Sequence, residues 1–494
     1  MKKMRIPTIL LCFVALLMFP AVTAQAGNTG YTYNYDYWGY DMESPDAYRA
    51  TEFVTGEELG IGKFNNPRGM YVRGNRVYVC DTGNNRIVIL EMVDNNLTYV
   101  DEFAEFTGDV DVKTFSSPND IFVDDNGDIY IADTNNQRVV HLNSDLDLIK
   151  ILTRPQDETV NQEGDFLPLK LVVDFSGRTI VLVRNFNQGF LQYDNNGEFT
   201  GYTGANEVKF SVVDYIWKRI ATKEQRAQME QFVPTEYNNL TLDKDAFIYC
   251  TTSMFDENEL LSDQAKPIRQ LNAQGDDILV KNGYHPPIGD VIWADYAGSN
   301  GPSTLIDITT LDNQTYYALD SNRSRIFGYD SQGNLLYAFG SVGNRMGYFQ
   351  RPVAIDHMGY DLLVLDAQSG GVTRFELTQF GELINKALAE YERGNYDESA
   401  DYWREVLMQN GNYDLAYIGI GRSLLRQDRY EEAMEYFEVK YDDDNYSKAF
   451  LLYRKQWVED NIFWIVVVIV VLIVISKIGD IVRKIKRISE VDVE

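Results

Sequence analysis

A short repeated β-meander is the feature that most constrains how this chain can fold. In its clearest copy, residues 118–142, an apolar strand is followed by a polar turn at 124–128, a β-rich strand at 129–132, a second turn and a third strand at 139–142. Gly127 allows the first turn to take a positive φ. Because a lone meander of this size cannot bury either face, we expect it to be one unit of an array.

The unit recurs along the chain. The six copies open at Pro67, Pro118, Pro168, Pro234, Pro302 and Pro352. The clearest adjacent pair, marked by Asp81 and Asp133, is 52 residues apart. Units three and four are eroded, and we place Arg184 and Thr251 where the other units have this aspartate. Three strands and a connecting fourth, repeated six times, predict a mainly β protein with a six-bladed β-propeller.

The motif within the unit resembles a known family. Phe-x-x-Pro is followed at 77–86 by Val-Tyr-Val-x-Asp-Thr-x-Asn-Asn-Arg. This pattern resembles the NHL repeat, a propeller family, and the resemblance covers about two thirds of the chain. It is strong in units one and two, fair in five and six, and weak in three and four.

The N-terminal region precedes the propeller. Residues 1–26 combine basic residues, an apolar run and a small-residue site ending at Ala26, which predicts a cleaved secretory signal peptide; the alternative is a retained anchor. Residues 27–47 form a Tyr-rich arm with aromatics at alternate positions, either packed against the propeller or presented as a ligand platform. We assign 48–381 to the propeller and expect 48–54 to supply the missing fourth strand of the last unit.

Two insertions interrupt the propeller. Residues 213–232 are charged, lack Gly and Pro, and have helical spacing, which predicts an inserted amphipathic helix. Residues 282–300 carry Tyr284, His285, Trp293 and Tyr296 and form either a binding loop or a loop packed on the surface.

The C-terminal region is helical. In 382–457, Tyr417-x-x-Ile-Gly-x-x-Leu, followed by Ala433 and Phe437, resembles the tetratricopeptide repeat (TPR), and we expect about two and a half helical hairpins. Residues 458–478 are long and apolar enough for a transmembrane helix, and 479–494 form a basic tail. The positive charge of this tail predicts a cytoplasmic C-terminus, with the propeller outside a cell membrane.

The net charge of the chain argues against one class of function. The chain has 74 acidic and 45 basic residues, for a formal net charge of −29, which disfavours nucleic-acid binding.

The two cysteines of the propeller are not expected to form a disulfide. We assign Cys80 and Cys250 to equivalent strand positions on opposite sides of the ring, where they are too far apart to be bridged. Both are expected to be buried apolar residues.

No catalytic motif is evident, and the three histidines His141, His285 and His357 lie at non-equivalent places in their units. We therefore predict no catalytic residue, no metal site and no resident cofactor. The family resemblance leaves calcium open, because gluconolactonase-like propellers bind it through acidic and amide groups. Early positions in the units offer such groups at Asn119, Asp120, Asn238 and Asn239.

The candidate binding residues follow the opening prolines, where the inner strands should begin. They are Arg68, Asn119, Asp120 and Lys170. Two function classes remain. The first is a membrane-tethered scaffold that binds a protein partner through the TPR-like helices and a carbohydrate or peptide on the propeller face, accessory to an envelope transport or polysaccharide system. The second is a metal-dependent, gluconolactonase-like hydrolase or lyase acting in the channel.

Overall fold

The computed structural model describes residues 32–160, 162–186, 188–204, 237–252, 265–290 and 301–491. The chain divides into two compact units, Met1–Gly381 and Glu382–Glu494. The expected helix at 213–232 lies outside the described residues, as do 1–31 and the part of the second insertion after Asp290.

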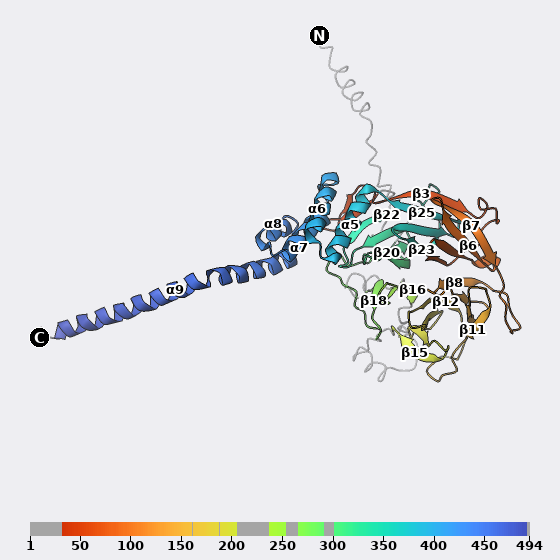
Figure 1. The fold of residues 1–494 in the computed structure, drawn as a ribbon, viewed down its shortest axis with the longest axis horizontal. Coiled ribbons are helices and arrows are strands. Elements are labelled where there is room, and N and C mark those ends of the chain that lie inside the picture. The colour runs from red at the N-terminus through yellow and green to blue at the C-terminus, as the bar shows by residue number, and fades with distance from the viewer. Residues whose placement is uncertain are drawn as a thin grey trace, which may run out of the picture. The chain divides into compact units, whose positions relative to one another are not determined.

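The first unit is the six-bladed β-propeller that the repeat predicts. Its strands form six antiparallel sheets whose inner strands, such as β8, β12, β16 and β23, lie around a common centre (Figure 1). Blades one to three consist of β4 (Met70–Arg73), β5 (Arg76–Asp81), β6 (Arg86–Val93), β7 (Asn96–Phe103); β8 (Pro118–Val123), β9 (Ile129–Asp133), β10 (Arg138–Leu142), β11 (Leu148–Leu152); and β12 (Pro168–Val173), β13 (Thr179–Val183), β14 (Phe190–Tyr193), β15 (Phe199–Thr203). The described strands of blades four and five are β16 (Tyr237–Leu242), β17 (Ile248–Thr252), β18 (Ile268–Leu271); and β19 (Leu305–Thr310), β20 (Tyr316–Asp320), β21 (Arg325–Tyr329), β22 (Leu335–Phe339).

Blade six closes the ring. Its first three strands are β23 (Pro352–Met358), β24 (Asp361–Asp366) and β25 (Gly371–Leu377), and its fourth is the N-terminal β3 (Tyr48–Thr55), which pairs antiparallel with β25. The predicted closure is thereby confirmed. Joining the two ends of the propeller in one sheet removes the open edge that separate terminal blades would expose.

The aspartate that recurs at the end of the second strand in units one and two has an architectural role. Asp133 is fully buried and accepts hydrogen bonds from the Ser116 backbone N–H at 2.7 Å and from Arg138 Nε at 2.8 Å. Asp81 makes the same pair of contacts in blade one, with Asn65 and Arg86. This aspartate therefore ties the entry of its blade to the second and third strands, as its repetition predicts.

The threonine after each of these aspartates joins neighbouring blades. Thr82 Oγ1 donates to the Pro118 carbonyl at 2.8 Å, and Thr134 Oγ1 donates to the Pro168 carbonyl at 2.6 Å. The Asp-Thr pair thus stabilises both the inside of a blade and the contact between blades.

In units three and four, the aspartate position lies one residue away from the position expected from the sequence. Val183 pairs with Pro168 and Thr252 pairs with Tyr237, as Asp133 pairs with Pro118. Val183 and Thr252, not Arg184 and Thr251, therefore occupy the aspartate position. The same shift means that Cys80 and Cys250 are not equivalent, although both are buried free thiols as expected.

Part of the Tyr-rich arm packs against the propeller. β1 (Tyr33–Tyr35) pairs with β22 and with β2 (Asp41–Glu43), which extends blade five to six strands. The Tyr33 and Tyr35 hydroxyls donate to Asp290, which also pairs with Arg325. Trp38, at the hairpin tip, remains 69% exposed.

The second unit is helical. It contains most of α5 (Gln379–Arg393), then α6 (Tyr396–Gln409), α7 (Asp414–Arg426), α8 (Tyr430–Val439) and α9 (Asp443–Val491). α6 packs on α7, α7 on α8 and α8 on α9. Small residues permit close approach of neighbouring helices: Gly421 of α7 faces the Phe437 ring of α8. This packing is what the small and aromatic positions predict, but the TPR assignment itself remains a prediction.

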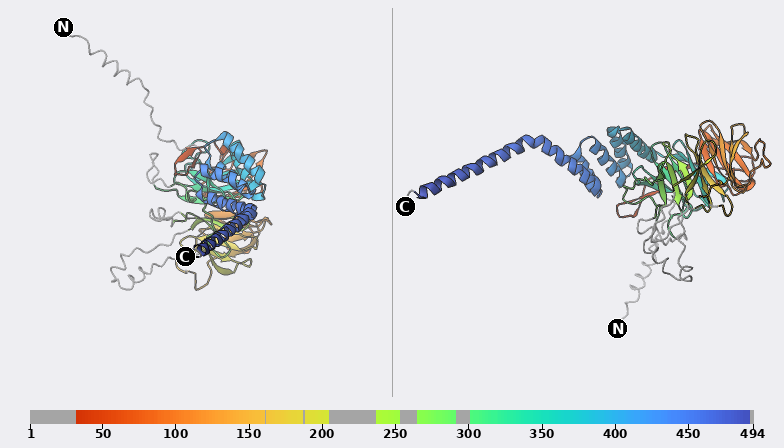
Figure 2. Two further views of the ribbon diagram at one scale, coloured as in Figure 1. Left: turned by 90° about the vertical axis from the view of Figure 1, so that its left-hand side faces the viewer. Right: turned by 90° about the horizontal axis from the view of Figure 1, so that it is seen from below.

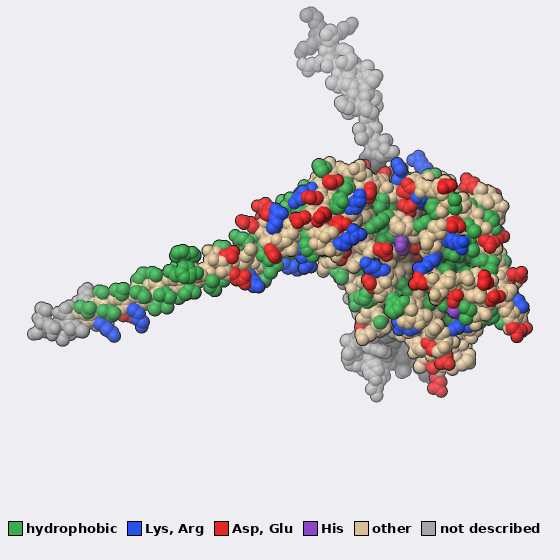
Figure 3. Space-filling model, viewed as in Figure 1, with side chains coloured by type: hydrophobic (Ala, Val, Ile, Leu, Met, Phe, Trp, Pro, Cys, Tyr) green, Lys and Arg blue, Asp and Glu red, His purple; other side chains and the backbone are tan. Residues whose placement is uncertain are grey.

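The last helix contains the expected apolar segment. Within Asp443–Ile485, α9 is long and apolar enough to cross a membrane, and its apolar window is unburied. The expected segment 458–478 lies within α9, which is one continuous helix that bends along its length (Figure 2). Figure 3 shows apolar side chains covering much of the surface of this helix before the basic residues near its C-terminal end.

Replacing Gly419 of α7 by alanine should destabilise the helical unit by about 1–3 kcal/mol. A Cβ at this position would overlap the Trp403 indole, which is only 3% exposed and cannot move aside freely. Thermal unfolding of the detergent-purified chain, followed by circular dichroism, measures the effect. Gly411→Ala is the matched control, because its Cβ would meet only ordinary contacts. An equal melting temperature for the two variants would contradict the prediction.

Candidate functional site

The inner strands place one residue of each blade in a ring around the centre. This position is paired with the residue just before the aspartate position of the second strand, as Asp120 is paired with Ala132. Between it and the opening of the strand lies an irregularity in the register, for example at Asn119 of blade two. The six ring residues, from blade one to blade six, are Gly69, Asp120, Lys170, Asn239, Asp307 and Ala354.

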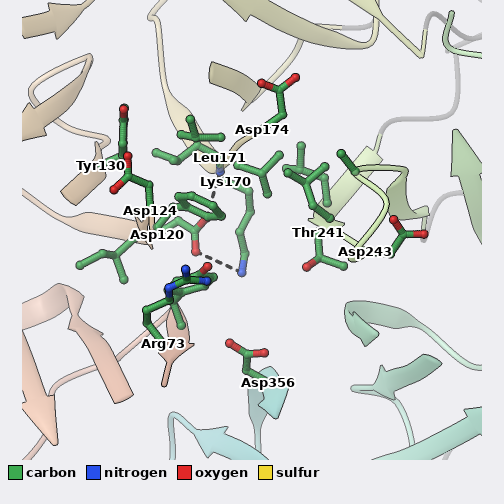
Figure 4. Close-up of a pocket in the computed structure, with 18 of the residues that line it drawn as sticks. Arg73, Asp120, Asp124, Tyr130, Lys170, Leu171, Asp174, Thr241, Asp243 and Asp356 are labelled. Atoms are coloured by element: carbon green, nitrogen blue, oxygen red, sulfur yellow. Dashed lines mark hydrogen bonds and ion pairs between the residues drawn. The ribbon is translucent and has the colours of Figure 1, made fainter. Parts of the chain in front are cut away.

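Three charged side chains of this ring meet. Lys170 Nζ lies 3.5 Å from Asp120 Oδ1 and 3.9 Å from Asp307 Oδ2, which links blades two, three and five. Figure 4 shows the Lys170 side chain extending into the cavity beside Asp120. The three residues form what we call the central triad.

Each carboxylate of the central triad also holds the backbone of the following blade. Asp120 Oδ2 accepts the Leu171 N–H at 2.9 Å, and Asp307 Oδ2 accepts the Ile355 N–H at 2.8 Å. The side chains are therefore fixed in place by the ring itself, which pre-organises them for whatever enters the channel.

Two carboxylates share a single ammonium group. Burial raises the pKa of Asp120, and it raises the pKa of Asp307 to about 7, although Lys170 partly offsets the effect in both cases. Burial opposes the charge on Lys170, but the two carboxylates outweigh it and raise the pKa of the ammonium. At neutral pH Lys170 therefore remains charged, and Asp307 is the group of the triad that gains or loses a proton as the pH passes through about 7.

A cavity of about 590 Å³ opens above the central triad, toward the turns that join first and second strands. All six blades contribute to its lining. Among the described residues, the lysines and arginines that line it are Arg73, Lys170 and Lys244, whereas nine lining residues are aspartates: Asp120, Asp124, Asp125, Asp128, Asp174, Asp243, Asp307, Asp312 and Asp356. Figure 4 shows several of these carboxylates, from different blades, around Lys170. The cavity is thus strongly acidic.

Aromatic side chains cover part of the wall. The rings of Tyr71 and Phe122, from blades one and two, lie 4.9 Å apart between centroids. Tyr130 stacks on His141 at 3.9 Å. Phe175, in a turn that lines the cavity, is 85% exposed.

The histidines do not form a metal site. His141 and His357 both line the cavity, but His141 Nε2 contacts Asp128 at 3.2 Å and His357 Nδ1 contacts Thr309 Oγ1 at 2.8 Å. Burial lowers the pKa of His141. His285 lies in an insertion and contacts the Asp36 carbonyl. Across the described ranges, no three His, Cys, Asp or Glu side chains are grouped so that they could hold a metal ion.

The four predicted binding residues separate into two pairs. Asp120 and Lys170 line the cavity, whereas Arg68 and Asn119 do not. Arg68 has an exposed side chain near the start of the inner strand, and partial loss of its hydration, together with the neighbouring Arg351 and Arg184, lowers its pKa. Whether any of the four binds a ligand remains a prediction.

Asp307 is not among the residues that the sequence pattern identified, whereas Asn239, one of the amide positions expected early in the units, does line the cavity. Unit five was aligned on Pro302, but the residue that corresponds to Pro118 is Leu305. The aspartate at the end of the second strand locates the ring residue better than the opening proline does. Asp307 precedes Asp320 by the same interval that separates Asp120 from Asp133.

Comparison with known families identifies the repeat in the first two blades. Residues 64–90 and 115–142 match the NHL repeat. A search of curated proteins found no match. Among solved structures, a catalytically inactive virginiamycin B lyase from Staphylococcus aureus with quinupristin has a TM-score of 0.39 and 13% identity, covering 67% of this chain and 88% of that one. A streptogramin B lyase has a TM-score of 0.41 and 11% identity over 68% of this chain and all of that one. A protein of unknown function from Bacteroides thetaiotaomicron has a TM-score of 0.41 and 13% identity over 66% and 72%.

Proposed function

We propose that this NHL-repeat propeller protein is a membrane-anchored extracytoplasmic binding protein. Its propeller cavity binds a small ligand, and its TPR-like helices bind a protein partner. The observation that carries the proposal is the central triad at the base of a 590 Å³ cavity. A propeller ring does not need buried charges, since blades one and six have Gly69 and Ala354 at the same position. Concave sites with a few fixed polar groups are typical of ligand binding.

The proposed membrane anchor is the apolar part of α9, and the orientation is inferred from charge. Residues 1–26 would export the leading segment, and the basic residues that follow the apolar run would stay in the cytoplasm. Holding two binding surfaces beside one membrane raises their effective concentration for a shared partner. This arrangement fits an accessory role in an envelope transport or polysaccharide system.

The hydrolase or lyase alternative receives less support. It requires a metal bound in the channel, and the described part of the chain offers no cluster of ligating side chains for one. The binding proposal requires no group beyond those that line the cavity.

Cysteine labelling tests the proposed orientation. In a Cys12→Ser background, Val342→Cys should react with a membrane-impermeant maleimide on intact cells, because Val342 is 56% exposed on the propeller. Lys484→Cys should react only after the cells are opened. Cys80 and Cys250 are fully buried and should stay unlabelled in both variants. Labelling of position 484, but not 342, on intact cells would refute the extracytoplasmic propeller.

A further inference from the structure

The charge of the cavity determines whether a cation or an anion can bind there. Nine lining aspartates face three bases, and those bases already have partners: Arg73 pairs with Asp125, Lys170 with the other members of the central triad, and Lys244 donates to the Asp312 carbonyl. Among its described contacts, Asp243 accepts hydrogen bonds from neutral groups only. Asp356 accepts from two backbone N–H groups and Thr309 Oγ1, and its only described ion-pair contact is the imidazole of His357, whose Nδ1 lies 3.4 Å away. An anion entering this space would be repelled, whereas a cation would be attracted.

A second, independent observation points to a ligand that also carries an oxygen. Asn239 is 1% exposed and lines the cavity, and its Nδ2 has no hydrogen-bond partner among the residues that the structure describes. Its Oδ1 is already bonded to the Leu240 N–H at 2.6 Å. A buried amide donor without an acceptor is costly, so an acceptor atom supplied by a ligand would satisfy it. A hydroxyl oxygen meets this requirement without adding negative charge beside Asp120 and Asp307.

The aromatic wall fits the same ligand. Tyr71 and Phe122 offer π-systems within the lining, where an ammonium or the polarised C–H face of a sugar ring can pack. Phe175 also lines this cavity, and its ring is exposed to water unless a ligand covers it. A volume of about 590 Å³ accommodates one or two sugar rings.

We propose that the cavity binds a small hydroxylated amine of the amino-sugar class. The ammonium lies among the aspartates that include Asp243 and Asp356, and a hydroxyl accepts from Asn239. This inference rests on the proposed binding function and specifies its ligand.

The test uses the full-length chain in detergent and isothermal titration with three probes: glucosamine, N-acetylglucosamine and glucose. Glucosamine should bind at least about 10-fold more tightly than either neutral sugar, since only it carries a charge that the carboxylates can bind. Asp243→Asn keeps the acceptor oxygen of its turn and should weaken glucosamine binding by about 10-fold. Asp276→Asn is the matched control, because Asp276 is an exposed aspartate of the same blade outside the cavity.

The variant Asn239→Ala separates the two contacts. It should weaken glucosamine while leaving the preference over N-acetylglucosamine unchanged, because the preference depends on the carboxylates. Equal affinity for all three sugars would overturn the charge argument while leaving a sugar-binding propeller in place. If the folded wild-type chain bound none of the three probes, the proposed ligand class would be overturned. Neither result bears on the orientation, which the labelling experiment tests separately.

Discussion

Replacing Asp133 by alanine is expected to reduce the free energy of unfolding of the propeller by about 3–5 kcal/mol, because it leaves a buried guanidinium without its counter-charge. Arg138 is 7% exposed, and its Nε contacts the Asp133 carboxylate at 2.8 Å. The same carboxylate accepts the Ser116 N–H, which would lose its partner as well. The remaining guanidinium contacts, to the Val112 and Thr114 carbonyls, do not replace the lost charge.

Chemical denaturation of the full-length chain, followed by tryptophan fluorescence, measures this loss. Asp145→Ala in the same blade is the control, because Asp145 is exposed and its effect should stay below about 0.5 kcal/mol. A double variant, Asp133→Leu with Arg138→Leu, should recover a large part of the stability, since removing both charges avoids an unpaired one. A loss under 1 kcal/mol for Asp133→Ala would mean that the carboxylate is not the stabilising partner of Arg138.

This aspartate also explains how much of the fold could be predicted. Where it is present, it fixes the phase of the unit, and the six blades and the closing strand β3 follow from the repeat. In units three and four, Val183 and Thr252 take its place, and the run 180–183 that ends at Val183 is apolar throughout. A continuous apolar run has no period-two alternation to fix the phase of the strand, so the sequence placed the aspartate position one residue away.

The site was less predictable for a different reason. Asp120 lines the cavity, whereas its neighbour Asn119 lies at the register irregularity of the strand and does not. The repeat pattern alone does not show which of the two positions the irregularity turns toward the cavity. The contact between Lys170 and Asp307 joins blades separated in sequence by more than 130 residues. Local patterns give the position of each side chain in its own blade, but the partner across the ring depends on the three-dimensional closure of the propeller.

Replacing Lys170 by methionine should produce the strongest pH-dependent loss of stability in the protein. The substitution keeps the length of the side chain but removes the only cation of the central triad. At pH 8, above the wild-type pKa of Asp307, the two carboxyl groups must either stay ionised without the ammonium or take up protons, and we expect a loss of about 3–5 kcal/mol. Lys244→Met is the matched control: Lys244 lines the same cavity but is exposed, and its ammonium contacts only a carbonyl.

The direction of the pH dependence follows from the carboxylates. Asp307 has a folded-state pKa of about 7, above its ordinary value of 3.8, so the folded chain takes up its proton more readily than the unfolded chain. The stability linked to this proton is present at low pH and is lost as the pH rises through about 7. Removing Lys170 takes away a charge that lowers the pKa of both carboxylates, so the variant should lose stability more steeply than the wild type over the same range.

The difference in melting temperature between Lys170→Met and the wild type should therefore be large at pH 8 and shrink toward pH 5, where Asp307 is below its pKa of about 7 and its protonated carboxyl group no longer needs the ammonium. Adding Asp307→Asn to Lys170→Met should restore part of the stability at pH 8, because one buried charge is removed while an oxygen remains for the Ile355 N–H. Thermal scans of the three proteins between pH 5 and pH 8 measure both effects. A difference that stays constant across this range would show that Lys170 acts through packing alone, and the electrostatic account of the central triad would then be wrong.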